Sequence, residues 1–195
     1  VISGPGSGKT TVIVNRVYNL IIKHNIKPSS ILVITFTKAA AVSMKERFMS
    51  LEGSLNVPVT FGTFHAVFFT ILRHAYNYSV NSIITRDLQY NFIRDKLISF
   101  ELEYSDENEM VNSILSQISK VKNDCLNIDE YISTACPYET FRIIYKEYGK
   151  MLISRRLIDY DDMVVLCNEL LTQRTDYKAA WQDKYKYILI DEFQD

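Results

Sequence analysis

The first residues of the chain combine small, flexible positions with a cation and a hydroxyl group. The segment 1–11 reads VISGPGSGKTT, with glycine at three alternate positions that let bare backbone approach a ligand. The N–H groups of such a loop, followed by the amino-terminal end of a helix, favour bound phosphate groups. Lys9 is then placed to reach the outer phosphates of a nucleoside triphosphate, and the Thr10 hydroxyl to ligate Mg²⁺. The strict form of this pattern has glycine at the position of Ser3, whose side chain is small enough for the same turn.

The contacts expected from this segment form one continuous nucleotide-binding stretch. Its members are Ser3, Gly4, Pro5, Gly6, Ser7, Gly8, Lys9, Thr10 and Thr11.

A second group of chemically capable residues lies at the other end of the chain. The apolar run 185–190 predicts a strand, and it leads directly into Asp191 and Glu192. Asp191 is suited to hold Mg²⁺, mostly through water, and Glu192 to orient or deprotonate the water that attacks the γ-phosphate. We therefore predict that Lys9, Asp191 and Glu192 are catalytic, that Thr10 and Asp191 are metal ligands, and that both ends of the chain meet around one Mg²⁺–ATP.

Apolar runs alternate with helical periodicity along the amino-terminal part of the chain. They predict strands at 31–36 and 57–61, among helices at 9–24, 38–50 and 66–76. This alternation indicates an α/β fold with a parallel sheet, whose carboxyl strand ends share one ligand-binding edge. The residues that follow the first two strands should lie at that edge: Thr35, Phe36, Thr37, Thr63, Phe64 and His65.

The composition changes near Ser79, and from there to Arg155 no strand of core type is evident. Helical patterns replace the strands, most clearly at 110–121 and 138–153. The sequence therefore predicts a core in two parts, 1–78 and 156–195, with a helical subdomain inserted at 79–155.

Three carboxylates, Asp159, Asp161 and Asp162, begin the helical pattern 157–172. Such a cluster could hold a metal ion. Acidic residues that cap and charge a helix amino terminus are the better interpretation.

The composition is that of an ordinary globular protein, with 47% hydrophobic residues and a net charge of −1. That charge argues against a generally basic nucleic-acid-binding surface, although not against a local basic groove. The three cysteines lack metal-ligand spacing and favour a reducing compartment, so we expect a cytoplasmic protein. No apolar run approaches the length of a membrane span, so no membrane partner is expected. The absence of an initiating Met suggests a piece of a larger protein.

Several separate segments, taken in order, resemble the motifs of superfamily 1 DNA helicases of the UvrD/Rep type. SGPGSGKT resembles motif I, and ITFTKAAAVSMKER resembles motif Ia, with Lys38 where the family often has Asn. FGTFHAVFF resembles the next DNA-contacting motif, and LIDYDDM the segment that re-enters the core after the inserted domain. ILIDEFQD fits the Asp-Glu-x-Gln-Asp motif II, and the resemblance covers nearly the whole chain.

The resemblance implies a P-loop NTPase lobe of the RecA-like type, with an inserted all-helical subdomain and with ATP and Mg²⁺ as cofactors. It adds Gln194 to the nucleotide site and places single-stranded DNA across the sheet edge, where Phe36 and Phe64 are candidates to stack on bases. It also implies 3′-to-5′ movement and a second RecA-like lobe of the same parent chain. Because arginine fingers would come from that lobe, we expect the 195 residues alone to be nearly inactive.

Other functions stay open on the sequence alone. A close variant is the helicase part of a helicase–nuclease of the AddA or RecB kind. A different class is a P-loop phosphotransferase, although the Asp-Glu-x-Gln-Asp segment suits attack by water. A non-catalytic nucleic-acid-binding module would not need Lys9, Thr10, Asp191 and Glu192.

Overall fold

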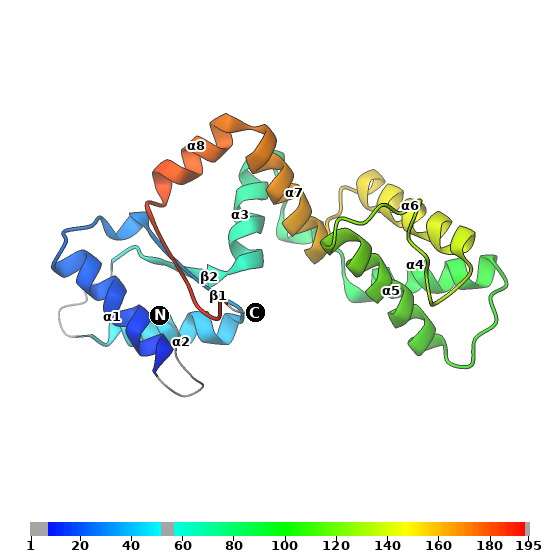
Figure 1. Ribbon diagram of the computed structural model, residues 1–195, viewed down its shortest axis with the longest axis horizontal. Helices are drawn as coiled ribbons and strands as arrows, with labels where there is room; N and C mark the ends of the chain where they lie inside the picture. The colour runs from blue at the N-terminus through cyan, green and yellow to red at the C-terminus, as the bar shows by residue number, and fades with distance from the viewer. Residues whose placement is uncertain (1–7, 52–56, 194–195) are drawn as a thin grey trace. The chain divides into compact units, whose positions relative to one another are not determined.

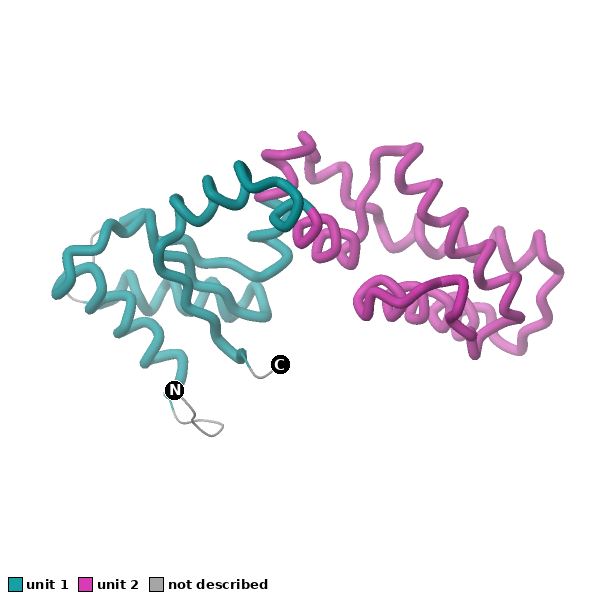
Figure 2. Tube along the Cα trace, turned by 45° about the horizontal axis from the view of Figure 1, so that its top comes forward, with its two compact units in different colours: residues 1–70, 170–195 teal, residues 71–169 magenta. Residues whose placement is uncertain are grey.

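A computed structural model describes residues 8–51 and 57–193 of the chain. The chain forms two compact units, one made of residues 1–70 and 170–195 and the other of residues 71–169 (Figure 2). The predicted insertion, 79–155, falls inside the second unit. Its boundaries as a subdomain remain a prediction.

The first unit is built on a three-stranded parallel sheet in the order β2-β1-β3 (Figure 1). The strands are β1 (Ile31–Thr35), β2 (Thr60–Thr63) and β3 (Tyr187–Ile190). Leu32 of β1 lies opposite Thr60 of β2 and Ile188 of β3. All five residues of β1 are buried, as expected for a central parallel strand covered on both faces. The predicted α/β class, a parallel sheet flanked by helices, is confirmed.

Helices cover both sides of this sheet. Figure 1 shows α1 (Lys9–Ile22) and α2 (Lys38–Met49) on one side, and α8 (Thr175–Lys184) with the start of α3 (Phe64–Tyr76) on the other. A short 3₁₀ turn, η1 (Pro28–Ser30), leads into β1. The apolar core of this unit joins α1 and α2 to the sheet through Val14, Val17, Leu20, Ile31, Val33, Met44, Phe48 and Val59.

Two elements differ from the sequence-based expectation. The predicted strand 57–61 begins instead at Thr60, because Pro58 has no N–H to donate and Val57–Val59 form a turn. Val59 is nevertheless buried in the core, which explains the apolar pattern. Helix α8 was not predicted because none of its residues is buried, so it carries no apolar stripe.

The second unit is helical. Its elements are η2 (Val80–Ser82), α4 (Arg86–Ser99), α5 (Glu107–Asn123), α6 (Tyr138–Ser154) and most of α7 (Tyr160–Gln173), and α3 and α7 each contribute residues to both units. The only strand-like pairing among the described residues of this unit is a single bridge between Ile83 and Ile158. No helix in the described ranges is long and apolar enough to cross a membrane.

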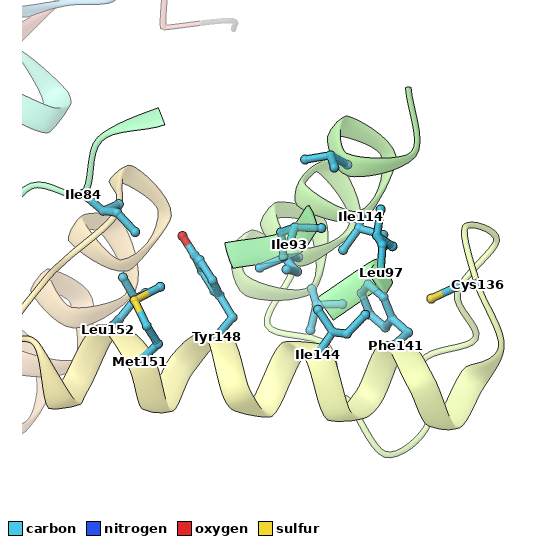
Figure 3. Packing of buried hydrophobic residues seen from close by; sticks show 13 residues of the cluster. Ile84, Ile93, Leu97, Ile114, Cys136, Phe141, Ile144, Tyr148, Met151 and Leu152 are labelled. Carbon is cyan, nitrogen blue, oxygen red and sulfur yellow. The ribbon is translucent and has the colours of Figure 1, made fainter. Parts of the chain in front are cut away.

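One side of α6 supplies much of the core of the second unit. Figure 3 shows Phe141, Ile144, Tyr148, Met151 and Leu152 pointing from α6 into the cluster. The partners on the other elements are Ile84, Ile93, Leu97, Val111, Ile114, Ile118, Val121 and Cys136.

The three cysteines are free, and they differ in burial. Burial raises the pKa of the Cys167 thiol to about 11 and also raises the pKa of Cys136, whereas Cys125 is exposed. Since the thiolate is the reactive form, we expect iodoacetamide to label Cys125 quickly and the other two only as the protein opens. Mass spectrometry of peptides from the folded protein checks this, with a Cys125→Ser variant as control. Rapid labelling of Cys167 in that variant would contradict the burial described here.

Candidate active site

The amino-terminal end of α1 presents backbone N–H groups suited to an anion. Gly8 precedes the helix with φ of 81°, a left-handed conformation that favours glycine, and its carbonyl accepts from the Val12 N–H at 3.0 Å. The N–H groups of the first turn, from Lys9 to Thr11, have no intrahelical carbonyl to bond, and Gly8 has no side chain to accept from them. These donors and the helix dipole favour a bound phosphate.

The two ends of the chain meet in an ion pair. The Lys9 ammonium donates to Glu192 Oε2 at 2.9 Å across 183 positions of sequence, where the end of β3 approaches the start of α1 (Figure 1). The two side chains retain 26% and 36% exposure. A pair this accessible contributes about 1 kcal/mol or less, so an anionic phosphate can displace Glu192 from Lys9 at little cost.

Asp191 lies between β3 and Glu192 and is only 5% exposed. Its N–H donates to the Ile34 carbonyl at 2.9 Å, which fixes the residue beside the end of β1. Among the described residues, none donates a hydrogen bond or forms an ion pair to the Asp191 carboxylate. Carboxylate oxygens are the ligands that a hard cation such as Mg²⁺ prefers. The Asp191 carboxylate therefore fits a Mg²⁺ ligand.

Other predicted contacts of the site remain predictions. The joint ligation of a metal ion by Thr10 and Asp191 is one of them. No cluster of three or more His, Cys, Asp or Glu side chains that could hold a metal occurs within residues 8–51 and 57–193. The predicted nucleotide contacts that lie outside the described residues are Ser3, Gly4, Pro5, Gly6, Ser7 and Gln194.

The predicted DNA-contacting threonines lie at the carboxyl ends of β1 and β2. The Thr37 hydroxyl accepts from the Ala40 N–H at 3.1 Å at the start of α2, and Thr63 accepts from Ala66 at 3.2 Å at the start of α3. Both hydroxyls therefore cap helices, and each keeps a donor hydrogen for another partner. Thr35 ends β1 and is only 2% exposed, so a contact from its side chain to DNA remains a prediction.

The aromatic residues of the same edge differ in accessibility. Phe36 is 61% exposed, directly after β1. Phe64 is half-buried and its ring centre lies 6.1 Å from that of Phe68, while His65 is exposed. An exposed ring has the free face that base stacking needs, so Phe36 is the most accessible of the predicted stacking residues. Phe193, 82% exposed beyond Glu192, is a further aromatic side chain that sequence reasoning did not single out.

The acidic residues at the start of α7 cap the helix, and a lysine neutralises their charge. Asp159 Oδ1 accepts from the Asp162 N–H at 2.7 Å, so the predicted helix cap is confirmed. The Lys122 ammonium lies 2.7 Å from Asp159 Oδ2 and 2.7 Å from Asp162 Oδ1, and Tyr148 donates to Asp159 at 3.1 Å. Lys122 thus occupies the place that a metal ion could have taken.

Charge interactions in this cluster shift the pKa values of its members. Burial opposes the charge on Lys122, but the attraction of Asp159 and Asp162 is stronger in sum and raises the pKa of the ammonium. Burial, followed by the Asp159 charge, raises the pKa of Asp162. The stem of Lys122 can follow the apolar surface of α5 while its ammonium reaches the two carboxylates.

Comparison with known proteins identifies the family of the chain. The whole chain, residues 1–195, matches the family model described as the UvrD/REP helicase N-terminal domain. The chain is 34% identical to a probable DNA helicase II homolog of Mycoplasma capricolum, aligned over 100% of the chain and 28% of that protein. It is 32% identical to the ATP-dependent DNA helicase PcrA of Bacillus subtilis, over 99% of the chain and 27% of that protein, and 32% identical to the ATP-dependent DNA helicase Rep of Buchnera aphidicola, over 100% and 29%. The chain therefore spans less than a third of the length of these relatives.

Proposed function

Because the chain belongs to the UvrD/REP helicase N-terminal domain family, we propose that it is the ATP-binding lobe of an ATP-dependent DNA helicase that moves 3′ to 5′ along single-stranded DNA. The observation that supports this most is the 2.9 Å contact between Lys9 and Glu192. It brings a cation suited to phosphate and a carboxylate suited to a base to one place, beside the buried Asp191. The free cysteines are compatible with a cytoplasmic location, which is part of the proposal.

Lys9 and Glu192 have separate roles once ATP is bound. The γ-phosphate draws the Lys9 ammonium from Glu192, and the amino-terminal end of α1 binds the phosphate chain. The released Glu192 carboxylate accepts a hydrogen bond from the attacking water and then its proton. Bound Mg²⁺, held by Asp191 and Thr10, would neutralise charge on the β- and γ-phosphate oxygens.

DNA is proposed to bind the sheet edge next to this site. Phe36 and Phe64 directly follow strands β1 and β2, and β1 pairs with β3, which leads to Asp191 and Glu192. A base stacked on Phe36 therefore lies one strand away from the hydrolytic residues, and a base stacked on Phe64 lies two strands away. A second RecA-like lobe of the parent chain is proposed to complete the site, so the 195 residues alone should hydrolyse ATP slowly and unwind no duplex.

Removing the exposed ring at the sheet edge should weaken DNA binding. Phe36→Ala is expected to lower affinity for oligothymidylate by about tenfold, since a base–aromatic stack is worth about 1–3 kcal/mol. Fluorescence anisotropy at fixed salt measures this on the full-length protein. Ile22→Ala, which removes another exposed apolar side chain from the end of α1, is the matched control. Equal affinity of the two variants would rule out stacking on Phe36.

The proposed function as a whole is tested by ATP hydrolysis of the full-length protein with and without single-stranded DNA. We expect DNA to stimulate hydrolysis, and unwinding to require a 3′ single-stranded tail. Phosphate transfer to a small acceptor without DNA would instead support a phosphotransferase. A protein that binds DNA but neither binds nor hydrolyses ATP would be a non-catalytic module, and the proposal would be wrong.

A further inference from the structure

The second unit contains a cavity of about 510 Å³ that shares no residue with the candidate active site. This volume falls in the range of small-molecule sites, about 300–1,000 Å³. Its wall includes Tyr76 at the end of α3, Tyr78 just beyond it, Tyr145 and Gly149 on α6, and Arg156 just after α6. All of these residues lie within 71–169, so the cavity belongs to one unit.

Gly149 is an unusual residue for its position. It lies inside α6, where glycine is less favourable than alanine. A Cβ built at Gly149 meets no atom within 4 Å, so packing does not require the glycine. The lack of a side chain at Gly149 leaves open space in the wall of the cavity.

The aromatic part of the wall offers flat surfaces. The rings of Tyr76 and Tyr78 meet edge to face, with centres 6.1 Å apart and planes at 65°, and Tyr145 adds a third ring. Three hydroxyl groups lie at the tips of these rings. A planar heteroaromatic ring, which stacks on aromatic faces and bonds to polar tips, fits such a wall.

The charged part of the wall offers one available cation. Lys122 and Asp162 also line the cavity, and the Lys122 ammonium is already held by Asp159 and Asp162, which also neutralises the Asp162 charge. Arg156 is exposed, has φ of 53°, and forms no ion pair with any residue in the described ranges. A guanidinium in this position is suited to a phosphate group.

We propose that this cavity binds one nucleotide unit, with its base against the tyrosine rings and its phosphate on Arg156. Either a nucleotide of a DNA strand or a free nucleotide has this chemistry. The strand is the expected source, and in that respect the inference deepens the proposed function. Gly149 leaves the room that the base occupies.

Photocrosslinking locates the bound unit directly. The full-length protein is irradiated with iododeoxyuridine monophosphate or with an oligothymidylate that carries one iododeoxyuridine, and mass spectrometry maps the attached peptides. We expect the oligonucleotide to attach at Tyr76, Tyr78 or Tyr145. Gly149→Leu, which places a bulky side chain in the wall of the cavity, should lower this attachment about tenfold, the value of one base–aromatic stack. Gly149→Ala, which adds one methyl group in open space, is the matched control and should keep the attachment.

Arg156→Gln provides a second variant if Gly149→Leu does not fold. Because Arg156 is exposed, this substitution should leave the fold intact. It should lower both the amount of attached oligonucleotide and the dependence of attachment on salt concentration, because one phosphate contact is lost. If only the free nucleotide became attached, the cavity would bind free nucleotides, and the proposal that it binds a DNA strand would be wrong. Attachment of neither probe at the three tyrosines, or attachment unchanged by both variants, would overturn the inference. The DNA-stimulated ATP hydrolysis of the unaltered protein, measured in parallel, tests the proposed function independently.

Discussion

Glu192→Gln is expected to lower DNA-stimulated ATP hydrolysis by about 10²- to 10⁴-fold while ATP still binds. The amide keeps the size of the side chain and can still bond to water, but it cannot accept the proton of the attacking water. It also weakens the contact with Lys9, which leaves that ammonium more available to phosphate. Steady-state hydrolysis by the full-length protein, together with binding of a fluorescent ATP analogue, measures both effects.

Two other variants make the result for Glu192 interpretable. Lys9→Ala should lose both hydrolysis and tight binding, because its ammonium is proposed to contact the phosphates directly. Glu46→Gln makes the same chemical change on the exposed surface of α2 and should hydrolyse ATP at the normal rate. If Glu192→Gln behaves as Glu46→Gln does, Glu192 is not the base.

Lys122→Met is expected to destabilise the second unit by about 3 kcal/mol, because it leaves the buried Asp159 and the half-buried Asp162 without their cation. The Lys122 side chain is only 10% exposed and joins α5 to Asp159 and Asp162 at the start of α7. Hydrogen exchange of α5 and α6 peptides, followed by mass spectrometry, measures the loss locally. Lys120→Met changes an exposed lysine of the same helix and should have an effect of about 0.5 kcal/mol or less.

The pH dependence of the same peptides provides a second check. The folded pKa of Lys122 lies above its ordinary value of 10.5, so its contribution is fully present below pH 10.5 and is lost as the pH rises through the folded pKa. We therefore expect the native second unit to loosen at strongly alkaline pH. Lys122→Met should lack that alkaline step, and an identical step in the variant would show that Lys122 is not its cause.

The sheet was predictable because its strands carry a strong local signal. The run ILVIT is apolar at almost every position, as a strand buried on both faces requires, and β3 shows a similar run. Helix α8 lacked such a signal, since it buries none of its own residues. The predicted start of β2 was too early. The buried Val59 gives this segment an apolar pattern like that of a strand, but strand pairing needs an N–H group, which Pro58 lacks.

The candidate site was predictable in part for a different reason. Lys9 and Glu192 stand in segments whose residue types suit one reaction, and the parallel topology brings the two segments to one edge. The partners of Lys122 could not be predicted in the same way. They lie 37 and 40 positions away on another helix, and only the packing of α5 against the start of α7 brings the three charges together. The open space at Gly149 likewise appears only once α6 has neighbours.

The most direct test of the central claim is a crystal structure of the full-length protein with Mg²⁺ and a non-hydrolysable ATP analogue. We predict that the γ-phosphate contacts the Lys9 ammonium, that Asp191 lies on the metal side, and that Glu192 has separated from Lys9 to face the γ-phosphate. An analogue bound elsewhere, with the 2.9 Å pair between Lys9 and Glu192 intact, would contradict the account.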